Sequence, residues 1–182
     1  MSIPYIQTFS GTKFYSLKPR AQDVLLIDIA HALGNKCRYA GHCKDFYSVA
    51  QHSVLVSRIV PLEFKLWGLL HDAGEAYFAD IPNPIKREYL LFSEIEGPIM
   101  DAVIEQFGLT RPGTGEEMPK AVKHADKVLL ATESRDMLNV LWDNWESDYG
   151  HLALPEKIIA VGPREAKAMF LEEYDSILKL LS

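Results

Sequence analysis

The stretch WGLLHDAGEAYFADIPNPIK, residues 67–86, places ionisable side chains directly after an apolar helical run. The run Leu-Trp-Gly-Leu-Leu precedes His71, Asp72 and Glu75, and Asp80 follows five residues later. A helix that serves only the core gains nothing from adjacent ionisable groups, because a buried charge without a partner is costly. The pattern therefore indicates that a functional site lies at the end of a buried helix.

Outward from this stretch, apolar residues recur mostly with helical spacing. Ser48 is a suitable N-cap, and the helix that it begins is expected to close at Pro61. The Ser10-Gly11 pair between strand-like stretches predicts a short hairpin. We therefore expect an all-α fold, one compact helical domain over residues 1–182, with a short N-terminal β-hairpin. The expected helices span residues 24–34, 48–60, 62–78, 93–107, 119–145 and 164–180.

Composition sets the broad class of protein. The chain has 182 residues, 48% of them hydrophobic, which is enough for one domain with a substantial core. Its net charge of −6 and its lack of a basic run argue against a nucleic-acid polymer as partner, although a single nucleotide needs only a few cations. The apolar runs are far shorter than the roughly 20 residues that span a bilayer, and the N-terminus lacks signal-peptide features. With two cysteines and no disulfide framework, we expect a cytoplasmic protein without a membrane partner, in the host cytoplasm if a phage encodes it.

His71 and Asp72 are candidate metal ligands, because imidazole nitrogen and carboxylate oxygen both bind zinc and related divalent ions. On a helix the two side chains project about 100° apart, so one ion can take both only above the groove between them. Glu75 lies one turn beyond His71, beside such an ion, where it can act as an acid or base. A surface polar patch is the alternative interpretation of an isolated His-Asp pair.

Two distant residues strengthen the metal interpretation. His52 lies among apolar residues of its predicted helix, where a lone histidine is usually a core or boundary residue. Asp126 lies on the apolar stripe of another helix, where a carboxylate needs a partner. A shared ion would supply partners for both. Two histidines and two carboxylates that leave coordination positions open are typical of a catalytic rather than a structural site.

The order His52, then His71-Asp72, then Asp126 resembles the H…HD…D signature of the HD-domain metal-dependent phosphohydrolases. The segment HDAGEAYFADIPNPIK is similar to the corresponding helix and loop of bacterial 5′-deoxynucleotidases and of phage dATP triphosphohydrolases. FYSVAQHSVLVSRIV and IAHALGNKCRYAGH also resemble the phage enzymes, so the likeness covers roughly residues 5–145. The resemblance implies a single HD-type phosphohydrolase domain.

The resemblance also implies roles for individual residues. The implied metal ligands are His52, His71, Asp72 and Asp126. The implied catalytic carboxylates are Glu75, as acid or base, and Asp80, near the sugar or the attacking water. The implied substrate contacts are Arg38 and Lys86, as cations for the phosphates, and Tyr39, as a ring that packs on the sugar or base.

The donor set suits zinc best, and cobalt, manganese and iron fit the same ligands. Magnesium is expected to accompany the substrate phosphates. The substrate that the resemblance implies is a deoxynucleotide, dATP first, which would be cleaved to deoxyadenosine with release of triphosphate or phosphate. The resemblance also implies a homo-oligomer, either a dimer or a hexamer.

Other functions stay open. A 5′-deoxynucleotidase acting on deoxynucleoside monophosphates would share the metal centre but need less cationic surface, since Lys86, Lys123 and Lys127 are the candidates for a longer phosphate chain. A non-catalytic nucleotide sensor on an HD scaffold would be expected to lose a ligand or Glu75, and all of them are present. Cleavage of cyclic dinucleotides is disfavoured, because the sequence lacks the GYP element of that branch.

Several remaining signals have simpler interpretations. Cys37 and Cys43 lack zinc-finger spacing, so we expect unligated thiols. The stretch RPGTGEE, residues 111–117, lacks the lysine and the strand-to-helix context of a phosphate-binding loop. Trp142 and Trp145 lie with leucines at helical spacing, which predicts core packing or a subunit contact.

Overall fold

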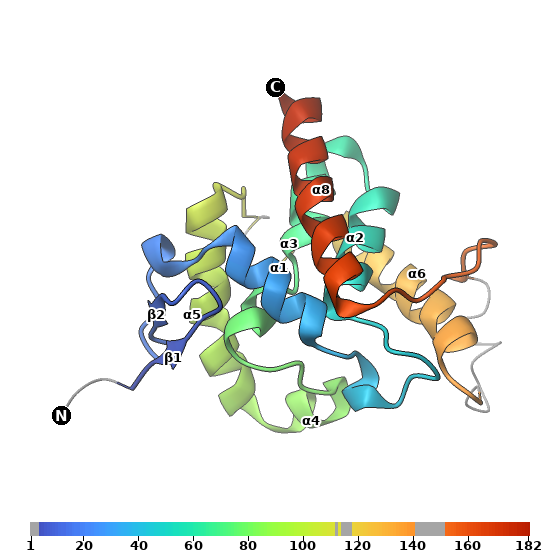
Figure 1. Cartoon of the computed structure of the whole chain (residues 1–182), viewed down its shortest axis with the longest axis horizontal. Coiled ribbons are helices and arrows are strands. Elements are labelled where there is room, and N and C mark those ends of the chain that lie inside the picture. The colour runs from blue at the N-terminus through green and yellow to red at the C-terminus, as the bar shows by residue number, and fades with distance from the viewer. Residues whose placement is uncertain (1–3, 112, 114–117, 141–151) are drawn as a thin grey trace.

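The structure is a computed structural model that describes residues 4–111, 113, 118–140 and 152–182. It confirms the predicted fold class, since the described chain is mostly helical with a small antiparallel hairpin near its start (Figure 1). The α-helices are α1 (Leu26–Asn35), α2 (Val49–Ile59), α3 (Lys65–Leu70), α4 (Asn83–Glu88), α5 (Leu90–Phe107), α6 (Lys120–Met137) and α8 (Pro163–Leu181). Short 3-10 turns are η1 (Ala21–Asp23), η2 (Tyr39–Gly41), η3 (Leu62–Phe64) and η4 (Ala73–Tyr77). None of the described helices combines the length and the apolar character that a membrane crossing requires.

The hairpin pairs β1 (Ile6–Gln7) with β2 (Lys13–Phe14), as the Ser10-Gly11 signal predicts. Gly11 adopts a φ of 90°, which residues with a side chain rarely accept. The hairpin is anchored by Phe14, which is fully buried and stacks on Tyr77 with ring centroids 3.9 Å apart. Since Tyr77 closes η4, the hairpin supports the segment that follows His71-Asp72.

Helix α2 is the central helix of the core. Ser48 caps it as predicted, its hydroxyl accepting a hydrogen bond from the Gln51 N–H (3.1 Å). Most of its side chains are buried, including that of His52, because α1, α3, α6 and α8 pack around it. Figure 1 shows α8 crossing in front of α2, with α5 and the hairpin on one side of the molecule and α6 on the other.

Helix α3 approaches α2 closely at Gly68. A Cβ atom at Gly68 would lie 2.9 Å from Ser57 Cα, so this contact requires glycine. Helix α3 ends two residues later, at Leu70. The close contact between the helices therefore holds His71 beside His52 in the core.

The predicted single helix over residues 62–78 is wrong. The backbone leaves α-helical geometry at Asp72 (φ −101°, ψ 12°), and the 3-10 turn η4 follows. Gly74 packs closely against Met100 of α5, which draws the chain away from the axis of α3. Asp72 and Glu75 therefore do not share the face of one α-helix.

The predicted helix over residues 119–145 ends earlier than expected. Helix α6 stops at Met137, and Leu138 is extended (φ −99°, ψ 149°). The Met137 carbonyl oxygen accepts a hydrogen bond from the Lys44 N–H (2.8 Å), so the loop after η2 caps the last turn. The tryptophan cluster of residues 142–145 lies outside the described residues.

Candidate metal centre

Three side chains meet in the core: His52 of α2 and the neighbouring pair His71 and Asp72 after α3. The two histidine Nε2 atoms are 3.3 Å apart. Asp72 Oδ2 lies 3.2 Å from His71 Nε2 and 3.7 Å from His52 Nε2. Both histidines are buried and Asp72 is partly buried. This group of donor atoms could hold a metal ion.

Hydrogen bonds on the far side of each ring determine which nitrogen faces the group. His71 Nδ1 donates to the carbonyl oxygen of Gly68 (2.8 Å). His52 Nδ1 donates to the buried carboxylate of Glu133 (2.6 Å). When both rings are neutral, each has one N–H, so the lone pairs of both Nε2 atoms point inward. Two lone pairs 3.3 Å apart repel each other unless a cation lies between them.

The donor distances match what a single small cation requires. Zinc binds nitrogen and oxygen ligands at about 2.1 Å, so neighbouring ligands of a tetrahedron lie about 3.4 Å apart. The observed separations of 3.2, 3.3 and 3.7 Å bracket that value. Two imidazole nitrogens and a carboxylate oxygen also suit other divalent transition metals. The residues present therefore fit a divalent ion.

Asp126 contacts the group from α6, with its Oδ1 3.3 Å from His52 Nε2. It does not belong to the mutual group, in which the donor atoms of His52, His71 and Asp72 all lie within 4.8 Å of one another. Its side chain is 43% exposed, so it lies at the rim rather than in the core. This position lets Asp126 offer a fourth donor from the solvent side.

The electrostatics of the group favour a positive charge at its centre. Burial opposes protonation of His52, but the carboxylates of Glu133 and Asp126 outweigh it and raise the pKa of His52 to about 9 when no metal is bound. Burial likewise works to raise the pKa of Asp72, yet His71 and His52 lower it well below its usual range. A cation, whether a proton or a metal ion, is therefore stabilised there.

Glu75 and Asp80 are carboxyl groups beside this centre. Glu75 is buried, and its Oε2 atom has no hydrogen-bond partner among the described residues. Burial first, and then the negative charges of Asp72 and Asp80, raise the pKa of Glu75 well above its ordinary value. Burial also raises the pKa of Asp80. A buried carboxyl with a raised pKa and an unpartnered oxygen is suited to proton exchange with a bound ligand.

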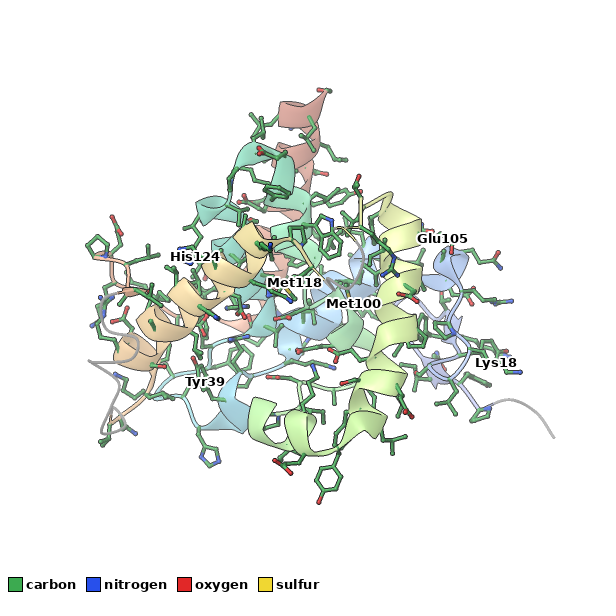
Figure 2. The ribbon with its side chains drawn as sticks, turned by 180° about the vertical axis from the view of Figure 1, so that it is seen from behind. Lys18, Tyr39, Met100, Glu105, Met118 and His124 are labelled. Carbon is green, nitrogen blue, oxygen red and sulfur yellow. The ribbon has the colours of Figure 1, made fainter. Side chains whose placement is uncertain are left out.

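Arg38 and Tyr39, the predicted substrate contacts, both bind Glu133. Arg38 Nε and Nη2 each lie 3.1 Å from Glu133 Oε2, while Nη1 faces Asp72 Oδ2 at 3.7 Å. The Tyr39 hydroxyl donates to Glu133 Oε2 (3.0 Å). Figure 2 shows Tyr39 on the segment next to α6, and the exposed His124 further along that helix. The Tyr39 hydroxyl is therefore engaged within the protein.

Two lysines lie near Glu75. The ammonium group of Lys86, the second predicted phosphate cation, is ion-paired with Glu96 of α5 (2.6 Å). Lys36, which follows α1, donates a hydrogen bond to the carbonyl oxygen of Glu75. Burial lowers the pKa of Lys36, and the carboxylates of Glu75 and Asp80 oppose that effect. Lys36 is thus a cation held at the site that the sequence did not single out.

Glu133 also escaped prediction from the sequence. It follows Asp126 by seven residues, which places both carboxylates on the same face of α6, two turns apart. That spacing is the signal that could have identified it. Lys36 has no comparable signal, because it follows the helix-ending Gly34-Asn35 pair without any periodic relation to the other site residues.

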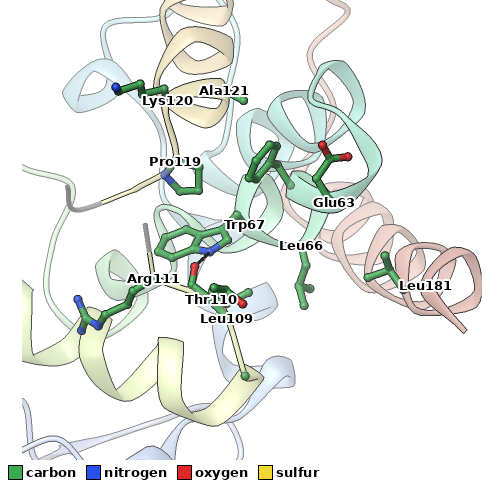
Figure 3. A pocket seen from close by; sticks show the side chains of 12 residues that line it. Glu63, Leu66, Trp67, Leu109, Thr110, Arg111, Pro119, Lys120, Ala121 and Leu181 are labelled. Atoms are coloured by element: carbon green, nitrogen blue, oxygen red, sulfur yellow. Dashed lines mark hydrogen bonds between the residues drawn. The ribbon is translucent and has the colours of Figure 1, made fainter. Parts of the chain in front are cut away.

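A separate cavity of about 600 Å³ lies at the start of α3 and α6 (Figure 3). Its lining is mostly apolar and includes Leu66, Trp67, Leu109 and Pro119. The Trp67 indole N–H donates to the carbonyl oxygen of Thr110 (2.8 Å). The candidate metal ligands are not part of this lining, so the cavity is distinct from the candidate metal centre.

The fold and the donor group define a mostly helical protein whose core contains a candidate metal centre. No protein-family model matches the chain. It is 41% identical over 177 residues to the uncharacterized protein YfdR of Escherichia coli strain K12, with 97% of each chain covered. It is also 28% identical over 190 residues to an uncharacterized protein of Rhodobacter capsulatus, with 95% of each chain covered. The chain belongs to the YfdR family.

Proposed function

We propose that the protein is a metal-dependent phosphohydrolase that acts on deoxynucleotides. The observation that carries the proposal is a three-donor group, His52, His71 and Asp72, beside the buried carboxyl of Glu75, whose Oε2 atom has no hydrogen-bond partner among the described residues. Hydrolysis of a phosphate ester needs both an electrophilic centre and a group that moves a proton. The resemblance of the H…HD…D pattern to the HD-domain phosphohydrolases supports the same reaction class.

The metal would be held by His52, His71 and Asp72, with Asp126 as the fourth ligand from the rim. Zinc is the proposed ion, and magnesium is proposed to accompany the substrate phosphates. When bound, a divalent ion supplies Lewis acidity, which polarises a phosphoryl oxygen and makes water more acidic.

Positive side chains would bind and orient the phosphate. Glu133 holds Arg38 through Nε and Nη2, which leaves the Nη1 edge, 3.7 Å from Asp72, for a phosphate oxygen. Lys36 adds a second positive charge beside Glu75. Together these cations would neutralise a phosphate that enters a site rich in carboxylates.

Glu75 would handle the proton. Its raised pKa favours the protonated form, so the carboxyl can donate a proton to the leaving oxygen of the nucleoside. Asp80, which raises the pKa of Glu75 further, is proposed to lie near the sugar or the attacking water.

The length of the phosphate chain separates two candidate activities. A dATP triphosphohydrolase is the first candidate, on the basis of the resemblance to the phage enzymes. One observation favours a 5′-deoxynucleotidase: Lys86 is paired with Glu96, and Lys123 and Lys127 are exposed on α6. A long phosphate chain would depend on these cations, whereas a monophosphate would need only Arg38 and Lys36.

The test is a product analysis of purified protein incubated with dATP, dAMP, ATP or dGTP and with Zn²⁺, Co²⁺ or Mn²⁺. Ion-exchange chromatography separates the products, with Asp72→Ala as the inactive variant and Asp175→Ala, an exposed carboxylate on α8, as the matched control. Deoxyadenosine plus intact triphosphate from dATP identifies the triphosphohydrolase. Turnover of dAMP, or stepwise release of phosphate, identifies the nucleotidase. Metal-bound protein that leaves every nucleotide intact refutes the proposal and favours a nucleotide sensor.

A further inference from the structure

Glu133 has a fully buried carboxylate that accepts hydrogen bonds from four different side chains. Oε1 accepts from His52 Nδ1 (2.6 Å) and from the Tyr47 hydroxyl (2.8 Å). Oε2 accepts from Arg38 Nε (3.1 Å) and from the Tyr39 hydroxyl (3.0 Å). Burial works to raise the pKa of Glu133, but Arg38 and His52 outweigh it and lower that pKa below its ordinary value. Burying a carboxylate costs more free energy than burying an apolar side chain of similar size, which points to a role beyond packing.

The two oxygens of Glu133 face different halves of the candidate site. Each accepts one tyrosine hydroxyl, and each also accepts one donor that belongs to the site. On Oε1 that donor is His52, whose opposite nitrogen faces the metal group. On Oε2 it is Arg38, whose Nη1 faces Asp72. One rigid carboxylate therefore connects the metal-facing ring to the phosphate-facing guanidinium.

The hydrogen bond to Oε1 determines how His52 binds a cation. Because Glu133 accepts a hydrogen bond from the Nδ1–H group, neutral His52 presents its Nε2 lone pair to the group, and the negative charge of Glu133 makes the ring a stronger ligand. The paired contacts on Oε2 hold the guanidinium plane of Arg38, a side chain that would otherwise have many rotamers.

We propose that Glu133 is a positioning residue that holds His52 and Arg38 at a fixed separation, so that the metal ion and the substrate phosphate bind at a fixed distance from each other. The Arg38 half of this inference rests on the proposed function, since it requires a phosphate ligand. The His52 half requires only the metal ion.

The experiment compares wild-type protein with Glu133→Gln in two separate binding assays. Affinity for zinc alone is measured by competition with a chromophoric chelator, and affinity for inorganic phosphate alone is measured calorimetrically in the presence of EDTA. Loss of Glu133 is expected to weaken zinc binding by about 10- to 100-fold and phosphate binding by about tenfold. Asp136→Asn is the matched control, because Asp136 is a buried carboxylate on the same helix that binds Arg135 and the Ile158 N–H instead. Its zinc and phosphate affinities should equal those of the wild type.

A spectroscopic measurement separates positioning from general packing. Long-range ¹⁵N–¹H correlation spectra of the zinc-loaded wild type should show the His52 proton on Nδ1, and Glu133→Gln should lose that well-defined state. If Glu133→Gln does not fold, Glu133→Asp is used under the same criteria, because it keeps the charge but is too short to reach both partners. Unchanged affinities in a folded variant, or the loss of only one of them, would overturn the inference. Loss of both affinities in a protein that hydrolyses no nucleotide would support the positioning role and refute only the proposed function.

Discussion

Replacing Glu75 by glutamine is predicted to stabilise the metal-free protein increasingly as the pH rises. Burial, and then the charges of Asp72 and Asp80, raise the pKa of Glu75 well above its ordinary value in the folded state. Below the unfolded pKa, near 4.3, the carboxyl is protonated in both states and contributes no pH dependence. Above it, the unfolded chain releases the proton while the folded chain retains it. Stability that is present in acid is therefore lost as the pH rises toward the folded pKa.

The magnitude follows from proton linkage. Each pH unit between the unfolded and folded pKa values of Glu75 costs the wild type about 1.4 kcal/mol of unfolding free energy. Because Glu75 is only 6% exposed, solvent screens this effect weakly. Glutamine has no proton to release, so the free energy of unfolding of Glu75→Gln minus that of the wild type should grow as the pH rises from the unfolded toward the folded pKa, by at most about 1.4 kcal/mol per pH unit. For a chain of this size that corresponds to about 3–5 °C in Tm.

The assay is urea denaturation at half-unit steps from pH 5 to pH 7, with EDTA present to remove metal. Glu172→Gln, on the exposed part of α8, is the control, and its difference from the wild type should stay flat across this range. A flat difference for Glu75→Gln as well would refute the raised pKa of Glu75 and, with it, the assignment of this carboxyl as the proton donor.

Three further predictions test the site and its supports. Zinc at 100 times its Kd should raise the unfolding free energy of the wild type by about 2.7 kcal/mol. A thermal-shift assay measures this effect, with Asp72→Ala for comparison, and an equal response of the variant would show that the ion binds elsewhere. Gly68→Ala should destabilise the protein by about 1–3 kcal/mol, because its Cβ meets the backbone of α2. Gly97→Ala lies inside α5 with nothing within 4 Å of the new Cβ, so it should stabilise the protein by up to about 1 kcal/mol in the same urea denaturation experiment. Equal losses for the two variants would disprove the close contact. Since Lys86 is held by Glu96, Lys86→Met should leave the KM for dAMP within about twofold, and a much larger rise would assign Lys86 to the first phosphate.

The fold class could be predicted because it depends on local signals. The helical spacing of apolar residues, the Ser48 cap and the Ser10-Gly11 turn act within a few residues of each other, and the structure agrees with all three. The break after α3 could not be predicted in the same way. It depends on the packing of Gly74 against Met100, a contact that links residues 26 positions apart in the chain.

The candidate site shows the same division between local and distant signals. The adjacency of His71 and Asp72 indicated a site, and the structure brings His52 to the same point because Gly68 lets α3 approach α2. The hydrogen bond between His52 and Glu133 could not be predicted, because Glu133 lies 81 residues further along the chain. The one sequence signal for its burial is its spacing from other residues of α6. Metal binding by this group stays a prediction.

The most direct test of the metal centre is anomalous diffraction at the zinc edge from crystals of the protein grown with zinc. We predict one strong peak in the core, about 2.1 Å from His52 Nε2, His71 Nε2 and a carboxylate oxygen of Asp72. A map without a peak at this point, or with its peak beside Cys37 and Cys43 instead, would contradict the metal centre on which the proposed function depends.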